Sequence, residues 1–125
     1  MAEGKIKVFV VDHSEVWRRI LAAQINSSSE MEVVGEINSG QGAILMLEEI
    51  DPDVVMLEAN IKDRMPLKDI IANLRLIKPG VRVLLCVDRR KKDSVIQTID
   101  DDVFDFVIKP YERNTVIRSI IECMQ

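Results

Sequence analysis

Short runs of β-branched and other apolar residues alternate along the chain with longer stretches in which apolar residues recur at helical spacing. The runs predict five strands, at residues 6–11, 32–37, 53–57, 81–87 and 103–108. The helical stripes between and after them are Val16, Trp17, Ile20, Leu21 and Ile25; Ala43, Ile44, Leu47 and Ile50; Leu67, Ile70, Ile71, Leu74 and Ile77; Val95, Ile96 and Ile99; and Val116, Ile117, Ile120 and Ile121. The pattern therefore predicts a strand and a helix in alternation throughout.

This alternation predicts the fold class. Strands separated by helices pair in parallel, and right-handed crossovers place the helices on both faces of the sheet. The continuous apolar run at residues 8–11 is typical of a strand that is buried on both faces. We therefore expect a doubly wound α/β fold with a five-stranded parallel sheet and five helices. In such sheets, ligands bind at the carboxyl ends of the strands.

Polar and turn-forming residues mark the ends of the predicted helices. Ser14 and Ser39 are placed to cap the first and second helices, and Asp93 is placed to cap the fourth. The sequence Lys78-Pro79-Gly80 ends the third helix. These signals agree with the boundaries that the hydrophobic pattern predicts.

Composition and charge narrow the classes of function. The 125 residues suffice for one domain, residues 1–125, and 17 basic against 21 acidic side chains leave a net charge of −4, which argues against nucleic-acid binding. Two cysteines and one histidine provide neither a disulfide framework nor a spaced metal motif. We find no apolar run long enough for a secretion signal or a membrane span, so we expect a soluble protein of the reducing cytoplasm.

Charged residues stand at the ends of three predicted strands. Asp12 follows the first strand, Glu58 the third and Lys109 the fifth, so all three are expected at one edge of the sheet. They form either a functional pocket or an ion-pair cluster that only holds the loops together, and both interpretations stay open. The loop at residues 12–15 contains no glycine and two acidic residues, which disfavours a nucleotide-phosphate site.

Three of these segments together resemble a known family. They are Val-Phe-Val-Val-Asp at residues 8–12, Pro-Asp-Val-Val-Met-Leu-Glu at residues 52–58 and Ile-Lys-Pro at residues 108–110. Their order and spacing are similar to those of the receiver domain of response regulators, and the likeness covers the whole chain. It implies the CheY-like, flavodoxin-like fold with strand order 2-1-3-4-5.

The resemblance also implies a chemistry for the pocket. In that family, two adjacent acidic residues and an Asp at the end of the third strand bind Mg²⁺, and that Asp accepts a phosphoryl group from a histidine kinase. A lysine after the fifth strand binds a phosphoryl oxygen. The likeness places Asp12 at the first acidic position and Lys109 at the lysine, and it makes Asp12, Glu58 and Asn60 the candidate metal ligands.

Three positions depart from the family pattern, and each departure has a chemical consequence. His13 replaces the second acidic residue, which removes a charge and an oxygen ligand, so we expect Mg²⁺ binding to be weakened and name no other cofactor. Val87 stands where a hydroxyl residue binds the phosphoryl group. Glu58 occupies the acceptor position and is one methylene longer than Asp. We expect its carboxylate to reach Lys109.

Surface features near the pocket suggest how a signal could leave it. A basic run follows the fourth predicted strand and consists of Arg89, Arg90, Lys91 and Lys92. We favour a solvated loop as its explanation, and a partner with an acidic face is the alternative. Phe106 stands at the family's aromatic switch position, and core packing fits its period too. Leu45 and Leu76 fall on the polar faces of their helices and are expected to be exposed.

Two functional hypotheses follow for a domain that we do not expect to be an enzyme. The first is a receiver-like module in two-component signalling that binds signalling proteins without phosphorylation control. The alternative is a working receiver that takes a phosphoryl group from a histidine kinase with Mg²⁺, at Glu58 or a nearby Asp. Expected partners are a histidine kinase, a downstream output protein or a second copy bound through the fourth helix, fifth strand and fifth helix. We expect no contact of this domain with nucleic acid or membrane.

Overall fold

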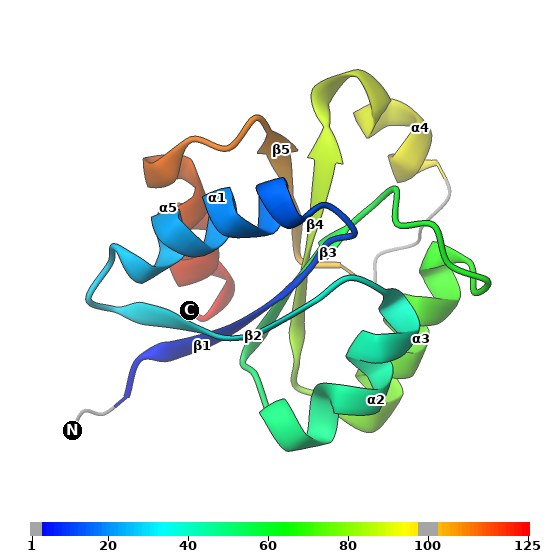
Figure 1. The fold of residues 1–125 in the computed structure, drawn as a ribbon, viewed down its shortest axis with the longest axis horizontal. Coiled ribbons are helices and arrows are strands. Elements are labelled where there is room, and N and C mark those ends of the chain that lie inside the picture. The colour runs from blue at the N-terminus through cyan, green and yellow to red at the C-terminus, as the bar shows by residue number, and fades with distance from the viewer. Residues whose placement is uncertain (1–3, 98–102) are drawn as a thin grey trace.

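A computed structural model describes residues 4–97 and 103–125, which form a five-stranded sheet with helices on both faces (Figure 1). The strands are β1 (Ile6–Val11), β2 (Met31–Ile37), β3 (Val54–Glu58), β4 (Arg82–Asp88) and β5 (Asp105–Lys109). All neighbouring strands are parallel, in the order β2-β1-β3-β4-β5. The predicted fold class and strand order are confirmed, and the strand boundaries agree within two residues.

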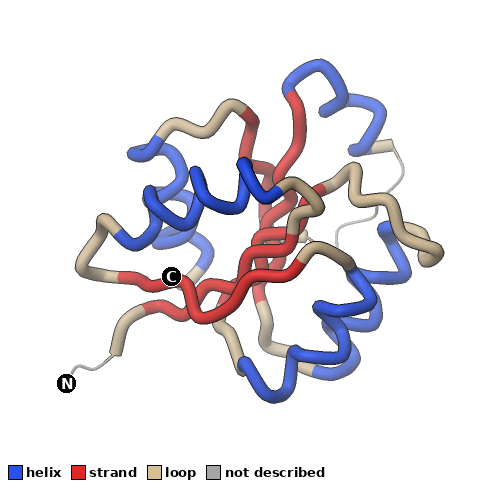
Figure 2. The backbone as a smooth tube through the Cα atoms, viewed as in Figure 1, coloured by secondary structure: helices blue, strands red, loops and turns tan. Residues whose placement is uncertain are grey.

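The helices divide between the two faces of the sheet (Figure 2). They are α1 (Glu15–Asn26), α2 (Gly40–Ile50), α3 (Leu67–Ile77), α4 (Lys92–Ile96) and α5 (Arg113–Cys123). Buried residues of α1 and α5 form one core cluster with the sheet, and those of α2, α3 and α4 form the other. Because all five strands are parallel, their carboxyl ends lie at one edge of the sheet.

The strands divide their side chains between the two core clusters with a period of two residues. In β1, Val8 and Val10 face α1 and α5, whereas Phe9 and Val11 face α2 and α3. Every residue of β3 is buried. Burial on both faces explains why the strands read as continuous apolar runs rather than as alternating ones.

Two of the predicted helix caps are present. The Ser14 hydroxyl accepts a hydrogen bond from the Trp17 backbone N–H at 3.3 Å, and the Ser39 hydroxyl accepts one from the Gly42 N–H at 3.0 Å. Each bond satisfies an N–H that the helix itself leaves without a partner. The cap at Ser14 also fixes the direction in which the chain leaves Asp12.

The predicted cap at Asp93 is wrong. The chain enters helical conformation earlier, in a 3-10 helix, η1 (Arg89–Lys91), and Asp93 lies in the first turn of α4. The Asp88 carboxylate caps η1 by accepting a hydrogen bond from the Arg90 N–H at 2.9 Å. Asp88, the last residue of β4, can satisfy the amides at the start of this helix sooner than Asp93 can. Ile99, the last member of the predicted stripe, lies outside the described residues.

The apolar stripe predicted for α1 is wider than its buried face. Leu21 and Ile25 are buried, but Val16 and Ile20 are 66% and 38% exposed. Val16 precedes Trp17 and Ile20 precedes Leu21, and both Trp17 and Leu21 pack against the sheet. One position along a helix turns a side chain by about a quarter turn or slightly more, so Val16 and Ile20 point away from the sheet. Leu45 and Leu76, predicted to be exposed, are 84% and 80% exposed.

The start of α2 packs closely against its neighbours, which gives a stability test. A Cβ atom added at Gly40 would lie 2.7 Å from the Asp63 carboxylate and closer still to the buried Ile70 side chain. We expect Gly40→Ala to lower the free energy of unfolding by about 1–3 kcal/mol in urea titrations. Gly80→Ala is the matched control, because nothing lies within 4 Å of its added Cβ. Equal stability of the two variants would contradict this packing.

Candidate functional site

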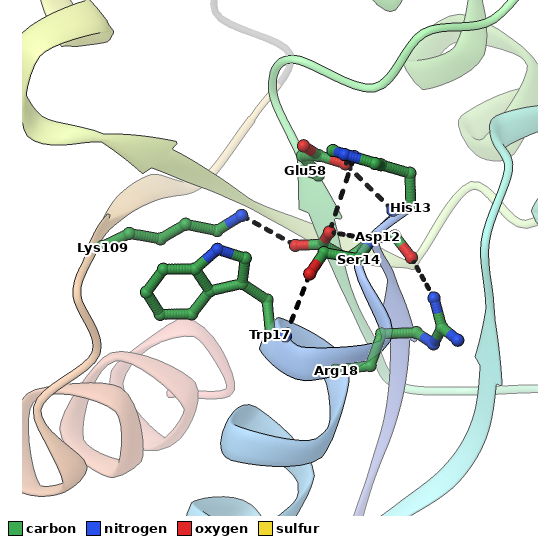
Figure 3. Close-up of polar contacts among 7 residues, drawn as sticks. All are labelled: Asp12, His13, Ser14, Trp17, Arg18, Glu58 and Lys109. Atoms are coloured by element: carbon green, nitrogen blue, oxygen red, sulfur yellow. Dashed lines mark hydrogen bonds and ion pairs between the residues drawn. The ribbon is translucent and has the colours of Figure 1, made fainter.

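Several of the predicted site residues, among them His13, Glu58 and Lys109, lie around a cavity at the carboxyl edge of the sheet (Figure 3). The cavity has a volume of about 320 Å³. It is lined by His13, Ser14, Trp17, Glu58, Asn60, Lys62, Cys86, Asp88, Lys91 and Lys109. Asp12 lies behind this lining and is only 3% exposed. The expectation that the ends of the first, third and fifth strands meet is therefore met.

Asp12 and Lys109 form a buried ion pair. The Lys109 Nζ donates to Asp12 Oδ2 at 2.8 Å, and the two side chains are 9% and 4% exposed. The second carboxylate oxygen accepts a hydrogen bond from the Ser14 backbone N–H at 2.8 Å. The Lys109 ammonium also lies 5.1 Å from the centre of the Trp17 indole ring. Asp12 is thus held from two sides, by the chain that follows it and by β5.

Glu58 contacts His13 instead of Lys109, so the predicted Glu58–Lys109 contact is wrong. Glu58 Oε1 accepts a hydrogen bond from the His13 backbone N–H at 3.0 Å and lies 2.6 Å from His13 Nδ1. β1 and β3 are neighbours in the sheet, so the loop after β1 passes directly beside the end of β3. The Lys109 ammonium is already paired with Asp12. Glu58 is 4% exposed, whereas the His13 side chain is 58% exposed.

Two residues that the sequence did not predict as site residues lie in the wall of the cavity or next to it. Cys86 of β4 lines it, and burial raises the pKa of its thiol to about 12, which keeps the sulfur neutral and weakly nucleophilic at neutral pH. Tyr111 lies beside Cys86 and packs edge-on against Trp17, with ring centres 5.5 Å apart. Each missed residue stands within two positions of one that was predicted: Cys86 precedes Val87, and Tyr111 follows Lys109.

Besides Asp12, the predicted positions Val87 and Phe106 do not line this cavity. Val87 is fully buried in the core cluster beneath α2, α3 and α4, so β4 presents Cys86 and Asp88 to the cavity instead. Phe106 is partly buried against the same cluster. It lines a separate groove of about 260 Å³ between β5 and α5, together with Arg89.

The basic run reaches the cavity through one of its four residues. Lys91 lines it, whereas Arg90 turns back and pairs with Asp88 at 3.3 Å. Hydrogen bonds from Arg90 lower the pKa of the Asp88 carboxyl, so that this acid stays ionised. All four residues, Arg89, Arg90, Lys91 and Lys92, are exposed. Arg89, Lys91 and Lys92 thus take no part in the ion pair between Arg90 and Asp88.

Comparison with known proteins identifies the family. Residues 8–121 match the response regulator receiver domain, and the chain belongs to this family of two-component signalling domains. It is 25% identical over 115 residues to the chemotaxis protein CheY of Listeria monocytogenes, covering 92% of this chain and 95% of CheY. The signal receiver domain of NarL from Mycobacterium tuberculosis superposes with a TM-score of 0.80 at 22% identity, covering 97% of both chains.

Some relatives are much longer than this chain. A protein-glutamate methylesterase/protein-glutamine glutaminase of Pyrococcus horikoshii is 33% identical over 106 residues, which cover 85% of this chain but 29% of that protein. The similarity therefore concerns the receiver portion of such proteins. No helix among the described residues is both long enough and apolar enough to cross a membrane.

The donor atoms in the cavity do not fit the Mg²⁺ ion that the family implies. Mg²⁺ requires near-octahedral oxygen coordination. Asp12 supplies the first carboxylate of the family's adjacent acidic pair, oriented by hydrogen bonds from Ser14 and Lys109. The side chain next to Asp12 contributes an imidazole nitrogen instead of an oxygen. Asn60 lines the cavity, but the all-oxygen set lacks the side-chain oxygen at position 13.

The buried ion pair generates a stability prediction. Asp12→Asn leaves the Lys109 ammonium buried without a counter-ion, so we expect a loss of about 3–5 kcal/mol in the free energy of unfolding. Urea titrations of the double variant Asp12→Asn, Lys109→Met should show a smaller loss in the free energy of unfolding than the summed losses of the two single variants. Arg19→Ala, in an exposed pair with Glu15, is the control and should change little. Additive losses would contradict the pairing.

Tyr111 gives a prediction for pH dependence. Burial raises its pKa above the usual 10, and Tyr111 is the chain's only tyrosine. The unfolded chain releases this proton at a lower pH than the folded protein, so stability is lost as pH rises beyond 10. We expect tyrosinate absorbance to appear only with unfolding, and Tyr111→Phe to flatten the decline. Tyrosinate formation near pH 10 in the folded protein would refute this burial.

Proposed function

We propose that this chain is a receiver domain that passes on its signal through protein contacts, without control by phosphorylation. The observation that carries this proposal is the state of Glu58. Its carboxylate is buried and hydrogen-bonded to both the backbone and the side chain of His13. Its Oε1, held in this way, is a poor nucleophile because attack would require it to leave both partners, and the same two bonds fix the direction of the carboxylate.

The surroundings of Glu58 support the same proposal. Phosphoryl transfer depends on positioning of the nucleophile and on stabilising the charge of the phosphoryl oxygens. The extra methylene of Glu58 moves the carboxylate, and Val87 is packed in the core and has no hydroxyl. Lys109 remains, but its ammonium is engaged by Asp12. Of the nucleophile, hydroxyl and lysine that such a reaction needs, the pocket therefore keeps the lysine, and the lysine is already paired with Asp12.

The partner surface that we propose is the face made by α4, β5 and α5. Ile96 and Phe104 are 41% and 49% exposed there, and the groove beside Phe106 is open to a partner's side chain. The exposed basic run at residues 89–92 adjoins this face and favours a partner with an acidic patch. A histidine kinase, a downstream output protein and a second copy of this chain are the candidates. We place this activity in the cytoplasm and expect no catalytic turnover.

The test of the proposal is phosphorylation itself. Incubation with Mg²⁺ and acetyl phosphate, followed by intact mass measurement, should leave the mass of the wild-type chain unchanged. The triple variant His13→Asp, Glu58→Asp and Val87→Thr restores the family pattern, and we expect it to gain the mass of one phosphoryl group. This variant is the matched control, because it shows that the conditions suffice.

A stoichiometric phosphoryl adduct on the wild-type chain would overturn the proposal and favour the alternative of a working phosphoacceptor. Peptide mapping would then assign the adduct to Glu58 or to a nearby Asp. Unchanged Trp17 fluorescence on addition of Mg²⁺ would agree with the proposal, because Trp17 lines the same cavity. Both readouts use the folded chain without further partners.

A further inference from the structure

Three side chains at the cavity bring a nitrogen and two carboxylates together. One ligand atom from each of Asp12, His13 and Glu58 lies within 4.8 Å of the others. His13 Nδ1 is 2.6 Å from Glu58 Oε1 and 3.8 Å from Asp12 Oδ1. The arrangement is not simply an acidic cluster, because the exposed member supplies an imidazole.

We propose that Asp12, His13 and Glu58 bind a transition-metal dication, with Zn²⁺ as its representative, in preference to Mg²⁺. Imidazole nitrogen together with carboxylate oxygen suits Zn²⁺, which is commonly held by three such protein ligands and a water. Mg²⁺ prefers oxygen alone. The replacement of an acid by His13 therefore changes which metal the pocket selects. This inference goes beyond the proposed function, because donor chemistry determines it independently of phosphoryl transfer.

The distances agree with such a site after one small movement. Ligand bonds of about 2.0–2.1 Å in tetrahedral geometry separate neighbouring ligand atoms by about 3.3 Å. The His13–Asp12 distance of 3.8 Å is close to this value, and the His13–Glu58 distance of 2.6 Å must widen. His13 can make that movement, because its side chain is 58% exposed and the other two are held in the wall. The metal then replaces the hydrogen bond between His13 and Glu58.

The surrounding residues orient the two carboxylates. Lys109 and the Ser14 backbone N–H fix the plane of the Asp12 carboxylate, and the His13 backbone N–H fixes Glu58. Such outer contacts position ligands and tune metal affinity. The Lys109 ammonium offsets one of the two negative charges, so we expect the site to bind more weakly than a structural zinc centre. The cavity leaves room for water at the remaining coordination position.

The chain is favourable for a clean test, because few other residues compete for the metal. His13 is its only histidine. The two cysteines, Cys86 and Cys123, are buried, and burial raises the pKa of their thiols to about 12 and about 11. Thiolate coordination in the folded protein is therefore disfavoured. Loss of zinc binding on substitution of one side chain can be assigned to this cavity.

The experiment is a titration of the folded chain with ZnCl₂ in competition with a chromophoric chelator, and in parallel with MgCl₂. We expect one Zn²⁺ per chain, bound at least tenfold more tightly than Mg²⁺. His13→Ala and Glu58→Gln should each weaken Zn²⁺ binding at least tenfold, while far-UV circular dichroism stays unchanged. Glu32→Gln, an exposed acid at the other end of the sheet, is the matched control and should bind as the wild type does.

A second variant tests the selectivity directly. His13→Asp restores an oxygen donor, so the ratio of Zn²⁺ to Mg²⁺ affinity should fall relative to the wild type. NMR spectra with Zn²⁺ should show the largest shifts in the backbone amides of His13 and Glu58. Equal affinity for the two metals, or Zn²⁺ binding that His13→Ala leaves intact, would overturn the proposal. Neither result depends on whether the chain accepts a phosphoryl group.

Discussion

The buried ion pair between Asp12 and Lys109 determines how the rest of the cavity is arranged. It joins the loop after β1 to the end of β5, two strands that do not pair in the sheet, at a donor–acceptor distance of 2.8 Å. A lone ammonium or carboxylate in that position would be costly, so each residue requires the other. With the ammonium taken by Asp12, the nearest partner for Glu58 is the exposed residue next to Asp12. Because of this first pairing, His13 and Glu58 become partners.

His13 and Glu58 are also matched to each other in length and chemistry. The longer side chain of Glu58 reaches both the backbone and the ring of His13. A second acid at position 13 would place a third carboxylate beside one lysine, whereas an imidazole accepts this proximity. We infer that the two departures from the family pattern depend on each other physically. Substitution of His13 alone would leave the buried Glu58 carboxylate without its imidazole partner.

The fold could be predicted from the sequence because strand and helix periods alternate without interruption and both faces of the sheet are apolar. The contacts in the site could be predicted only in part. The chain shows that Asp12, Glu58 and Lys109 meet at one edge, but which carboxylate binds the ammonium depends on side-chain directions that no periodicity encodes. The exposure of Val16 and Ile20 has a similar origin, because a helical stripe does not reveal how much of its width the sheet covers.

The wall of the cavity shows the same difference between pattern and packing. Cys86 and Val87 are consecutive in a buried strand, and only the alternation of side chains decides which one faces the cavity. In this chain Cys86 faces the cavity, and burial raises the pKa of its thiol so that the sulfur stays neutral. At Cys86, the wall of the cavity therefore has no hydroxyl group that could donate a hydrogen bond. The polar groups that line the cavity therefore lie on its other sides, at His13, Glu58 and Lys91 among others. The chemistry of the site therefore depends on these side chains, which follow or end different strands, more than on the residues of β4.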